Sequence, residues 1–155
     1  MITLRLASRN DAERIWHMQV EAFAGLLEKY GDAQTNPGAE PLARVQQRLA
    51  DPATSFYFIE AEGETVGAIR VVDRKDGSRK RVSPLFILPD CRGRGYAQAA
   101  MQEVERIHGG SWELTTIAEE PGNCHLYEKL GYRAVGEADV KIKYKGMTLI
   151  VYQKD

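Results

Sequence analysis

The sequence predicts a single α/β domain, of the α+β kind, over residues 1–155. A chain of this length fits one domain and can bury roughly two thirds of the surface that its unfolded form exposes. Hydrophobic residues make up 43% of it and charged residues 28%, which is the balance of an ordinary globular protein. Strand-like and helical periodicities alternate along the chain, and their order predicts β-α-α-β-β-β-α-β-α-β-β.

The first part of the chain predicts one strand and two helices. Residues 2–6 alternate apolar and polar side chains as a short strand does. Ser8 and Asp11 form the pattern of a capping box, and apolar residues then recur at helical spacing until Gly31. A second helix is expected over residues 40–50, which also have one apolar side.

Three strands follow, and the first two predict a hairpin. Residues 55–61 and 65–72 are β-branched and aromatic runs, joined by Glu62-Gly63-Glu64. Residues 82–88 form a further strand that contains Pro84. Because proline cannot donate a ladder hydrogen bond, we expect this strand to start late or to contain a bulge.

The last part of the chain predicts helices and strands in alternation. A glycine-rich segment after Pro89 runs directly into a good helix-forming sequence. The expected elements are a helix over 98–107, a strand over 111–117, a helix over 123–130 and two final strands over 132–138 and 147–152.

Charge excludes some classes of partner. The net charge is -1 and the pI is about 6.3, so no global positive field attracts nucleic acid or an anionic membrane. The turn over residues 73–81 carries five basic residues, which a solvated hairpin tip explains better than a nucleic-acid patch does. We therefore expect neither a nucleic-acid nor a membrane partner, and assign this turn no function.

Cysteine usage and hydropathy predict a cytoplasmic protein without a bound metal. Cys91 and Cys124 could form at most one disulfide, and neither belongs to a pair with the spacing of metal ligands. No apolar run reaches the length of a signal peptide or of a membrane span. A reduced compartment and a protein that is not exported are the simpler interpretation.

The glycine-rich segment over residues 92–97 predicts an anion site at the start of a helix. The first N–H groups of a helix have no partner within it, and the helix dipole is positive there. Gly93 and Gly95 remove side chains that would block a close approach, while Arg92 and Arg94 can add charge-assisted bonds to a diphosphate. A tight turn that merely needs positive φ angles is the alternative. The segment lacks the endings of a Walker loop and of a dinucleotide fingerprint.

Two motifs resemble those of the GNAT superfamily of N-acetyltransferases. Arg92, Gly95 and Ala97 match the pattern Arg/Gln-x-x-Gly-x-Gly/Ala after Leu85-Phe-Ile-Leu-Pro89, which resembles the coenzyme A loop of that family. The stretch Asn123-Cys-His-Leu-Tyr-Glu-Lys-Leu-Gly-Tyr132 resembles the later motif, in which a helix bearing a tyrosine ends at Leu-Gly-Phe/Tyr. The resemblance implies a mixed, mostly antiparallel central sheet of about six to seven strands flanked by about four helices.

The resemblance also implies acetyl-coenzyme A as the cosubstrate. Backbone amides of the loop would bind its pyrophosphate, and the strand before the loop would bind the pantetheine arm. The family often has an asparagine seven positions before the motif tyrosine, where this chain has Glu120. The coenzyme A site implied by the resemblance contains Phe86, Ile87, Leu88, Arg92, Gly93, Arg94, Gly95, Tyr96, Ala97 and Asn123.

Transfer of an acetyl group to an amine predicts roles for further groups. The amine must lose its proton, the thioester carbonyl must be polarised, and the leaving thiolate must be protonated. In the family an unpaired backbone N–H binds the carbonyl oxygen, and here the amide near Leu88 is the candidate. Tyr127 is the candidate acid by resemblance, and a core aromatic is its alternative interpretation. The base stays open, with Glu113, Glu119, Glu21 and Glu28 as the acids considered.

A small-molecule amine is the expected acceptor. By resemblance it would lie against residues 26–41 and 139–146. The first segment contributes Glu28, Asp32 and Glu40 and the second Lys141, Lys143 and Lys145, so a zwitterion is expected, with solvated loop charge as the alternative. Three other functions stay open: a non-catalytic module that binds acyl-coenzyme A or a partner protein, a peptide or protein N-acetyltransferase, and an enzyme that transfers a longer acyl chain. A homodimer also stays open.

Overall fold

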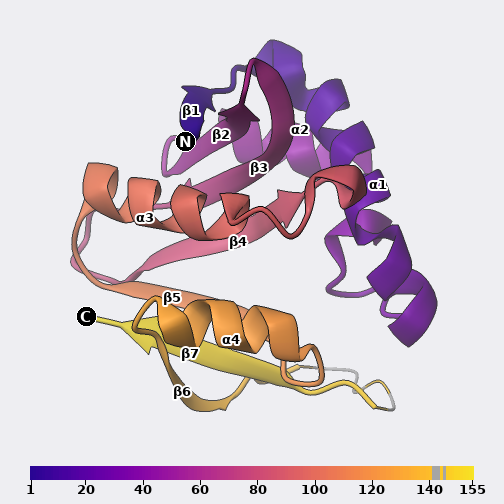
Figure 1. The fold of residues 1–155 in the computed structure, drawn as a ribbon, viewed down its shortest axis with the longest axis vertical. Helices are drawn as coiled ribbons and strands as arrows, with labels where there is room; N and C mark the ends of the chain where they lie inside the picture. The colour runs from indigo at the N-terminus through magenta and orange to yellow at the C-terminus, as the bar shows by residue number, and fades with distance from the viewer. Residues whose placement is uncertain (141–143, 145) are drawn as a thin grey trace.

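The computed structural model describes residues 1–140, 144 and 146–155. The chain forms a seven-stranded sheet with helices on both faces (Figure 1). The strands are β1 Thr3–Leu6, β2 Thr54–Ala61, β3 Glu64–Val72, β4 Lys80–Ile87, β5 Trp112–Ile117, β6 Arg133–Glu137 and β7 Leu149–Lys154. The helices are α1 Ala12–Tyr30, α2 Leu42–Ala50, α3 Tyr96–His108 and α4 Pro121–Lys129, with short 3-10 turns at Arg9–Asp11, Pro37–Ala39 and Pro89–Cys91.

The strand order is β1-β2-β3-β4-β5-β7-β6. Every neighbouring pair is antiparallel except β4 and β5, which are parallel. Their connection is the crossover through α3, as a parallel pair requires. The predicted fold class is therefore confirmed, including its mixed and mostly antiparallel sheet.

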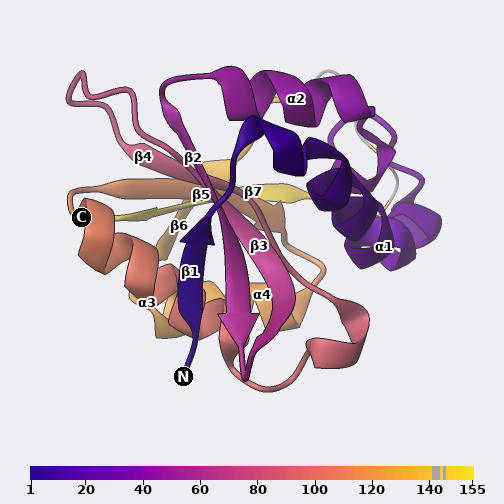
Figure 2. The ribbon, with the colours of Figure 1, turned by 90° about the horizontal axis from the view of Figure 1, so that it is seen from above.

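The sheet separates two hydrophobic cores. Helices α1 and α2 lie on one side of it and α3 and α4 on the other (Figure 2). Phe56, Phe58 and Phe86 fill the core under α1 and α2. Trp112 and Met101 belong to the larger core under α3 and α4. Strands β2, β3 and β4 contribute buried side chains to both cores, because successive residues of a strand point to opposite faces of the sheet.

Local sequence explains where α1 begins and ends. The predicted capping box of Ser8 and Asp11 caps the 3-10 turn Arg9–Asp11, which runs directly into α1, and in it the Ser8 N–H group donates to the Asp11 carboxylate over 2.8 Å. Gly31 closes the helix with a φ of 68°, and its N–H group donates to the carbonyl of Leu27 over 2.7 Å. Left-handed backbone of this kind favours glycine.

The strand predicted over 82–88 begins two residues earlier, at Lys80. The expected late start is therefore wrong, whereas the expected bulge is confirmed. Val71 pairs with Val82 but Ile69 pairs with Leu85, so β4 has one more residue than β3 between these pairs. The bulge lies at the point where Pro84 interrupts the strand.

Strands β4 and β5 separate soon after they meet. Their ladder contains only the pairs Lys80 with Trp112 and Arg81 with Glu113. Beyond Arg81 the two strands diverge, although β4 stays paired with β3 up to Ile87. A cleft therefore opens in the middle of the sheet.

Several predicted boundaries shift by one or two residues. Helix α3 begins at Tyr96 and not at residue 98, and α4 begins at Pro121 and not at residue 123. Proline suits the first helical position because its missing N–H group would have no partner there. The last strand is Leu149–Lys154, displaced from the predicted 147–152 by its register with β5, which pairs Ile117 with Leu149.

The described part of the chain can be compared with the expectations about disulfides and membrane-spanning segments. Cys91 and Cys124 are both free thiols, so no disulfide links them. None of the described helices has the length and apolar character that crossing a membrane requires.

Gly67 on β3 provides a test of the packing beside the cleft. A Cβ atom at this position would lie 2.1 Å from the carbonyl oxygen of Phe86 and 3.0 Å from the Cα atom of Ile87. We expect Gly67→Ala to lower the free energy of unfolding by about 1–3 kcal/mol, as overpacking against a fixed backbone does. Chemical denaturation measures the change.

The matched control is Gly25→Ala in the middle of α1, where an added Cβ atom meets nothing within 4 Å. Alanine is the better helix former, so this variant should be more stable by about 0.5–1 kcal/mol. Equal stability of the Gly67→Ala variant and the wild type would contradict the packing of β3 against β4.

Candidate functional site

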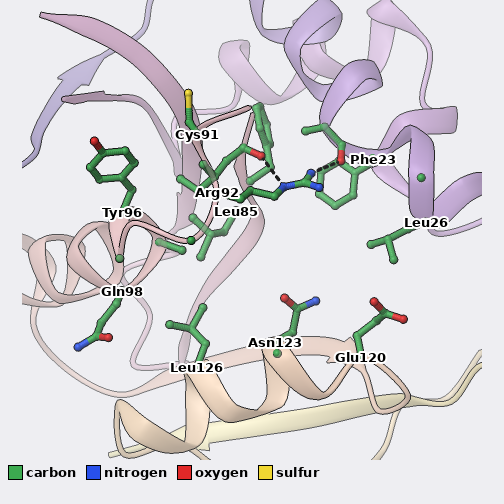
Figure 3. Close-up of a pocket in the computed structure, with 18 of the residues that line it drawn as sticks. Phe23, Leu26, Leu85, Cys91, Arg92, Tyr96, Gln98, Glu120, Asn123 and Leu126 are labelled. Atoms are coloured by element: carbon green, nitrogen blue, oxygen red, sulfur yellow. Dashed lines mark hydrogen bonds between the residues drawn. The ribbon is translucent and has the colours of Figure 1, made fainter. Parts of the chain in front are cut away.

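A cavity of about 710 Å³ lies on the α3 and α4 side of the cleft. Its walls come from α1, from the end of β4, from the glycine-rich loop before α3 and from α4 (Figure 3). Cavities of about 300–1,000 Å³ are typical of small-molecule and cofactor sites. Of the predicted site residues, the following line it: Phe86, Ile87, Arg92, Gly93, Gly95, Tyr96, Ala97, Asn123 and Tyr127.

Two predicted residues do not line this cavity. Leu88 and Arg94 are both absent from its walls, and the Arg94 side chain is exposed. Leu85 and Gln98, which the sequence motifs did not single out, take part instead. The strand therefore contributes Leu85 to Ile87, one residue earlier than predicted.

The glycine loop has the backbone geometry of an anion site. Gly93 and Gly95 have φ angles of 78° and 79°, and a Cβ atom built on either would meet nothing within 4 Å. The first helical bond of α3 runs from the N–H group of Ala99 to the carbonyl of Gly95 over 3.1 Å. The N–H groups of Tyr96, Ala97 and Gln98 therefore have no acceptor within the helix.

Arg92 connects this loop to the rest of the cavity wall. Its Nε donates to the carbonyl of Ile87 over 3.1 Å, and its Nη2 donates to the carbonyl of Ala22 on α1 over 2.6 Å (Figure 3). The sequence motif predicts that Arg92 binds a diphosphate. In the structure two of its guanidinium nitrogens join the end of β4 to α1, so Arg92 also supports the shape of the cavity.

The edge of β4 that faces the cleft presents backbone groups, but not at Leu88. The N–H group of Leu88 donates to the carbonyl of Val66 on β3 over 2.8 Å. The unpaired amide expected near Leu88 is therefore not that of Leu88 itself. Because successive residues point their backbone groups to opposite edges of a strand, Leu85 and Ile87 are the residues whose N–H groups face away from β3, toward the cleft.

Tyr127 lies on α4, in the wall of the cavity. Its ring packs against the rings of Tyr132 and Tyr152, with centroids 6.0 and 6.2 Å away. Its hydroxyl makes no hydrogen bond to any residue that the structure describes. Burial, followed by the influence of Cys124, raises the pKa of Tyr127 to about 12. The phenol therefore keeps its proton at neutral pH.

A charged bridge crosses one end of the cavity. Glu120, at the start of α4, accepts from the Lys29 ammonium over 2.7 Å and from the Tyr30 hydroxyl over 2.6 Å. The hydrogen bond from Lys29, and after it the one from Tyr30, hold the pKa of Glu120 below its ordinary value. The bridge could not be predicted from the sequence, because Lys29 and Tyr30 lie 91 and 90 residues from Glu120 and no local pattern connects them to it.

A second cavity, of about 360 Å³, meets the first. It lies between the end of α1, the loop after it, the diverging parts of β4 and β5, and the chain before β7. Five residues line both cavities: Phe23, Leu26, Leu85, Asn123 and Tyr127. The two cavities therefore adjoin at the cleft between β4 and β5, and Tyr127 lies where they meet.

None of the four acids considered as a base lines either of these two cavities. Glu119 accepts from the N–H group and the hydroxyl of Thr148. Glu113 accepts from Gln153 over 3.1 Å. Glu21 and Glu28 are exposed on α1. Glu120 is the carboxylate that does line the larger cavity.

The acids predicted to bind the acceptor either have hydrogen-bond partners already or lie outside the cavities. Asp32 lines the second cavity, but its carboxylate accepts hydrogen bonds from the N–H groups of Gln34 and Thr35 and from the Thr35 hydroxyl, all in its own loop. Glu40 is paired with Arg48 through two bonds of 2.7 Å. Glu28 lines neither cavity. The lysines predicted to complement these acids, Lys141, Lys143 and Lys145, lie outside the described residues.

The described residues contain no group of three or more histidine, cysteine, aspartate or glutamate side chains placed to bind a metal ion. The charged groups that line the larger cavity are Lys29, Arg92 and Glu120. This cavity therefore offers a ligand backbone amides, the Tyr127 hydroxyl and these charges.

The cleft and the glycine loop can be compared with solved structures. The spermidine N-acetyltransferase from Vibrio cholerae, in complex with CoA and spermine, superposes with a TM-score of 0.76 at 17% identity, over 99% of this chain and 94% of that one. An acetyltransferase from Thermus thermophilus gives a TM-score of 0.70 at 18% identity, over 99% and 96% of the two chains. At these identities the comparison shows a shared fold.

Several proteins that are similar to this chain in sequence carry the name acetyltransferase. Acetyltransferase plu1384 from Photorhabdus laumondii is 33% identical over 101 residues, which cover 63% of this chain and 69% of the relative. Acetyltransferase ECA0875 from Pectobacterium atrosepticum is 31% identical over 103 residues, or 64% and 72% of the two chains. The sequence profile of the acetyltransferase (GNAT) family matches residues 13–132, which run from the second residue of α1 past the glycine loop and α4. The chain therefore belongs to the GNAT family and is an N-acetyltransferase.

Proposed function

We propose that this enzyme transfers an acetyl group from acetyl-coenzyme A to the primary amine of a small molecule, by direct attack of the amine on the thioester. The observation that carries the proposal is the cleft between β4 and β5, which joins two cavities at Tyr127. A donor and an acceptor can enter from opposite faces of the sheet and meet there.

The larger cavity suits the donor. The pyrophosphate would lie against the N–H groups at the start of α3, where Gly93 and Gly95 leave open space and the helix dipole is positive. The pantetheine arm would extend along the free edge of β4, toward Leu85 and Ile87. A similar structure supports this choice of donor, since the Vibrio cholerae enzyme was solved in complex with CoA.

Acetyl-coenzyme A supplies an acetyl group that is activated as a thioester. An N–H group of Leu85 or Ile87 would donate to the thioester oxygen, which becomes more negative as the amine attacks. As the C–S bond breaks, the Tyr127 hydroxyl would give its proton to the departing sulfur, and the proton that the amine nitrogen loses on forming the amide would return to the Tyr127 oxygen through solvent. A thiol with a pKa near that of cysteine, about 8.5, is a fair leaving group, so Tyr127 assists the reaction without being indispensable.

The acceptor would occupy the second cavity. Its volume of about 360 Å³ is near the lower end of the range for small-molecule sites. The loop after α1 forms one wall of it, and the 3-10 turn Pro37–Ala39 in that loop is held to α1 by the Gln19 amide, which donates to the carbonyl of Pro37 over 2.7 Å. A cavity of this size favours a small amine over an extended peptide.

Release of free thiol from acetyl-coenzyme A tests the proposal. The purified protein is incubated with free amino acids, polyamines and peptide N-termini at equal concentration, and product masses are measured. Acetylated small amines are the expected products. Acetylation of peptides alone would overturn the acceptor class, and binding of acetyl-coenzyme A without thiol release from any amine would favour a non-catalytic module.

Acetyl-coenzyme A should stabilise the fold, and Gly95→Val should abolish this effect. Binding to the native state alone adds about 4 kcal/mol at a ligand concentration 1,000 times Kd, which thermal denaturation detects as a rise in Tm. A valine side chain at Gly95 would fill the open space in which the pyrophosphate is expected.

Gly77→Val is the matched control. Gly77 has a φ angle of 87° and open space around it, like Gly95 with 79°, but it lies in the hairpin before β4. Both variants should lose intrinsic stability through strain in the backbone. Only Gly95→Val should lose the ligand-dependent rise in Tm, and an equal rise in both variants would remove the loop from the donor site.

Tyr127→Phe should lower kcat by about tenfold to a thousandfold, because it removes the proposed proton donor. The rise in Tm with acetyl-coenzyme A should persist, since the ring still packs against Tyr132 and Tyr152. Steady-state kinetics under conditions where the chemical step limits turnover measures the change.

Tyr132→Phe serves as the control for losing a phenol. Its hydroxyl donates to Glu105 over 2.8 Å and Tyr132 lines neither cavity. This variant should be less stable but keep its kcat. If Tyr127→Phe instead lowers stability and leaves kcat unchanged, Tyr127 is a packing residue.

A further inference from the structure

Arg81 lies at the second cavity, away from the donor site. The charge pattern of the sequence predicts a solvated hairpin tip there, but Arg81 is the second residue of β4, opposite Glu113 on β5, and it lines the cavity. Its side chain is exposed. Among the residues that the structure describes, its guanidinium makes no hydrogen bond and no ion pair. A charge without a partner is thus available to a ligand.

Arg70 on β3 adds to the positive charge around Arg81. It shares a sheet face with Arg81, because Val72 pairs with Arg81 and lies two residues from Arg70. Its Nε donates to the carbonyl of Ser83, and it has no carboxylate within 4 Å in the described part of the chain. Burial and then the charges of Arg48 and Arg81 lower the pKa of Arg70 to about 10, so it stays charged at neutral pH.

Two carboxylates lie near this end of the cavity in the described part of the chain, Asp32 in its lining and Glu113 opposite Arg81, and each accepts hydrogen bonds from neutral donors. Asp32 is the acid in its lining, and Asp32 is 2% exposed. The backbone N–H groups of Gln34 and Thr35 donate to one oxygen of the Asp32 carboxylate over 2.9 Å, and the Thr35 hydroxyl donates to the other. Ser83 and Thr115 contribute hydroxyl groups to the same lining, and hydroxyl groups can donate to an anion.

From these contacts we propose that Arg81 determines specificity by binding an acidic group of the acceptor. The acceptor would be an amine that carries a carboxylate at its other end. Arginine pairs with a carboxylate through two parallel charge-assisted bonds, and this geometry orients the bound group as well as attracting it. A polycationic amine would meet repulsion at the same place.

The length of the acceptor follows from β4. The inference rests on the proposed function, in which the amine reaches Leu85 and Tyr127 where the cavities meet. Arg81 and Leu85 are four residues apart on β4, so their Cα atoms are at most about 13 Å apart at roughly 3.3 Å per residue. The Arg81 side chain spans part of this distance. Amino acids whose amine is several bonds from the carboxylate therefore suit the cavity better than α-amino groups.

The test compares acids with their uncharged amides. The wild type, Arg81→Met and Arg74→Met are assayed for thiol release with ω-amino acids of two to six carbons, the matching ω-amino carboxamides, α-amino acids and spermidine. Arg74→Met is the control, because Arg74 belongs to the same basic run but lines neither cavity. Calorimetry measures binding of the same acids to each protein in the presence of coenzyme A.

We expect the wild type and Arg74→Met to prefer the longer acids over their amides by at least about tenfold in kcat/KM. Arg81→Met should lose this preference through a higher KM for the acids, with weaker binding of the acids in calorimetry. Binding of acids that is equal in Arg81→Met and the wild type would overturn the inference.

A preference of the wild type for amides or spermidine would also overturn it while leaving acetyl transfer intact. Failure of the proposed function has a different signature, which is the absence of thiol release with every amine. Calorimetry still decides the role of Arg81 in that case, because binding of the acids needs no turnover: loss of binding in Arg81→Met supports the inference, and binding that is absent or unaltered contradicts it.

Discussion

The separation of β4 from β5 is the constraint on which the rest of the structure depends. Two residue pairs join these strands, and beyond them the backbone groups on the free edge of β4 either bond to other partners or face a cavity. Both occur here. The Arg92 guanidinium donates to the carbonyl of Ile87, while the N–H groups on the same edge face the space between the strands. Buried backbone groups without partners are costly, so a gap of this kind is maintained only where a ligand or solvent completes the bonding.

Helix α1 and helix α4 keep the gap wide without filling it. The Arg92 guanidinium connects the loop to α1 through Ala22, and Glu120 connects α4 to the end of α1 through Lys29 and Tyr30. These contacts use charged groups at the rim, whereas Phe86, Leu85 and Leu126 supply apolar contact at the base. Charged side chains thus hold the helices in place at the rim, whereas apolar side chains line the base, as in many enzyme sites.

Local signals predicted most of the fold and the parts of the site that lie within one motif. The capping box at Ser8, the glycine loop and the helix that carries Tyr127 are each encoded within a few residues. Sequence alone could place the unpaired N–H groups of β4 only near Leu88, because the residues whose N–H groups face the cleft are set by the bond between Leu88 and Val66, which no motif encodes. The Glu120 bridge and the position of Arg81 also depend on pairings across the whole chain.

The two-residue ladder between β4 and β5 also affects how the domain is held together. It divides the sheet into a half that contains β1 to β4 and a half that contains β5 to β7, joined by α3 and by the contacts around the cavity. The glycine loop belongs to the first half and α4 to the second. A ligand bound between them would therefore act as a mechanical link, and its binding free energy would add to the cohesion of the two halves.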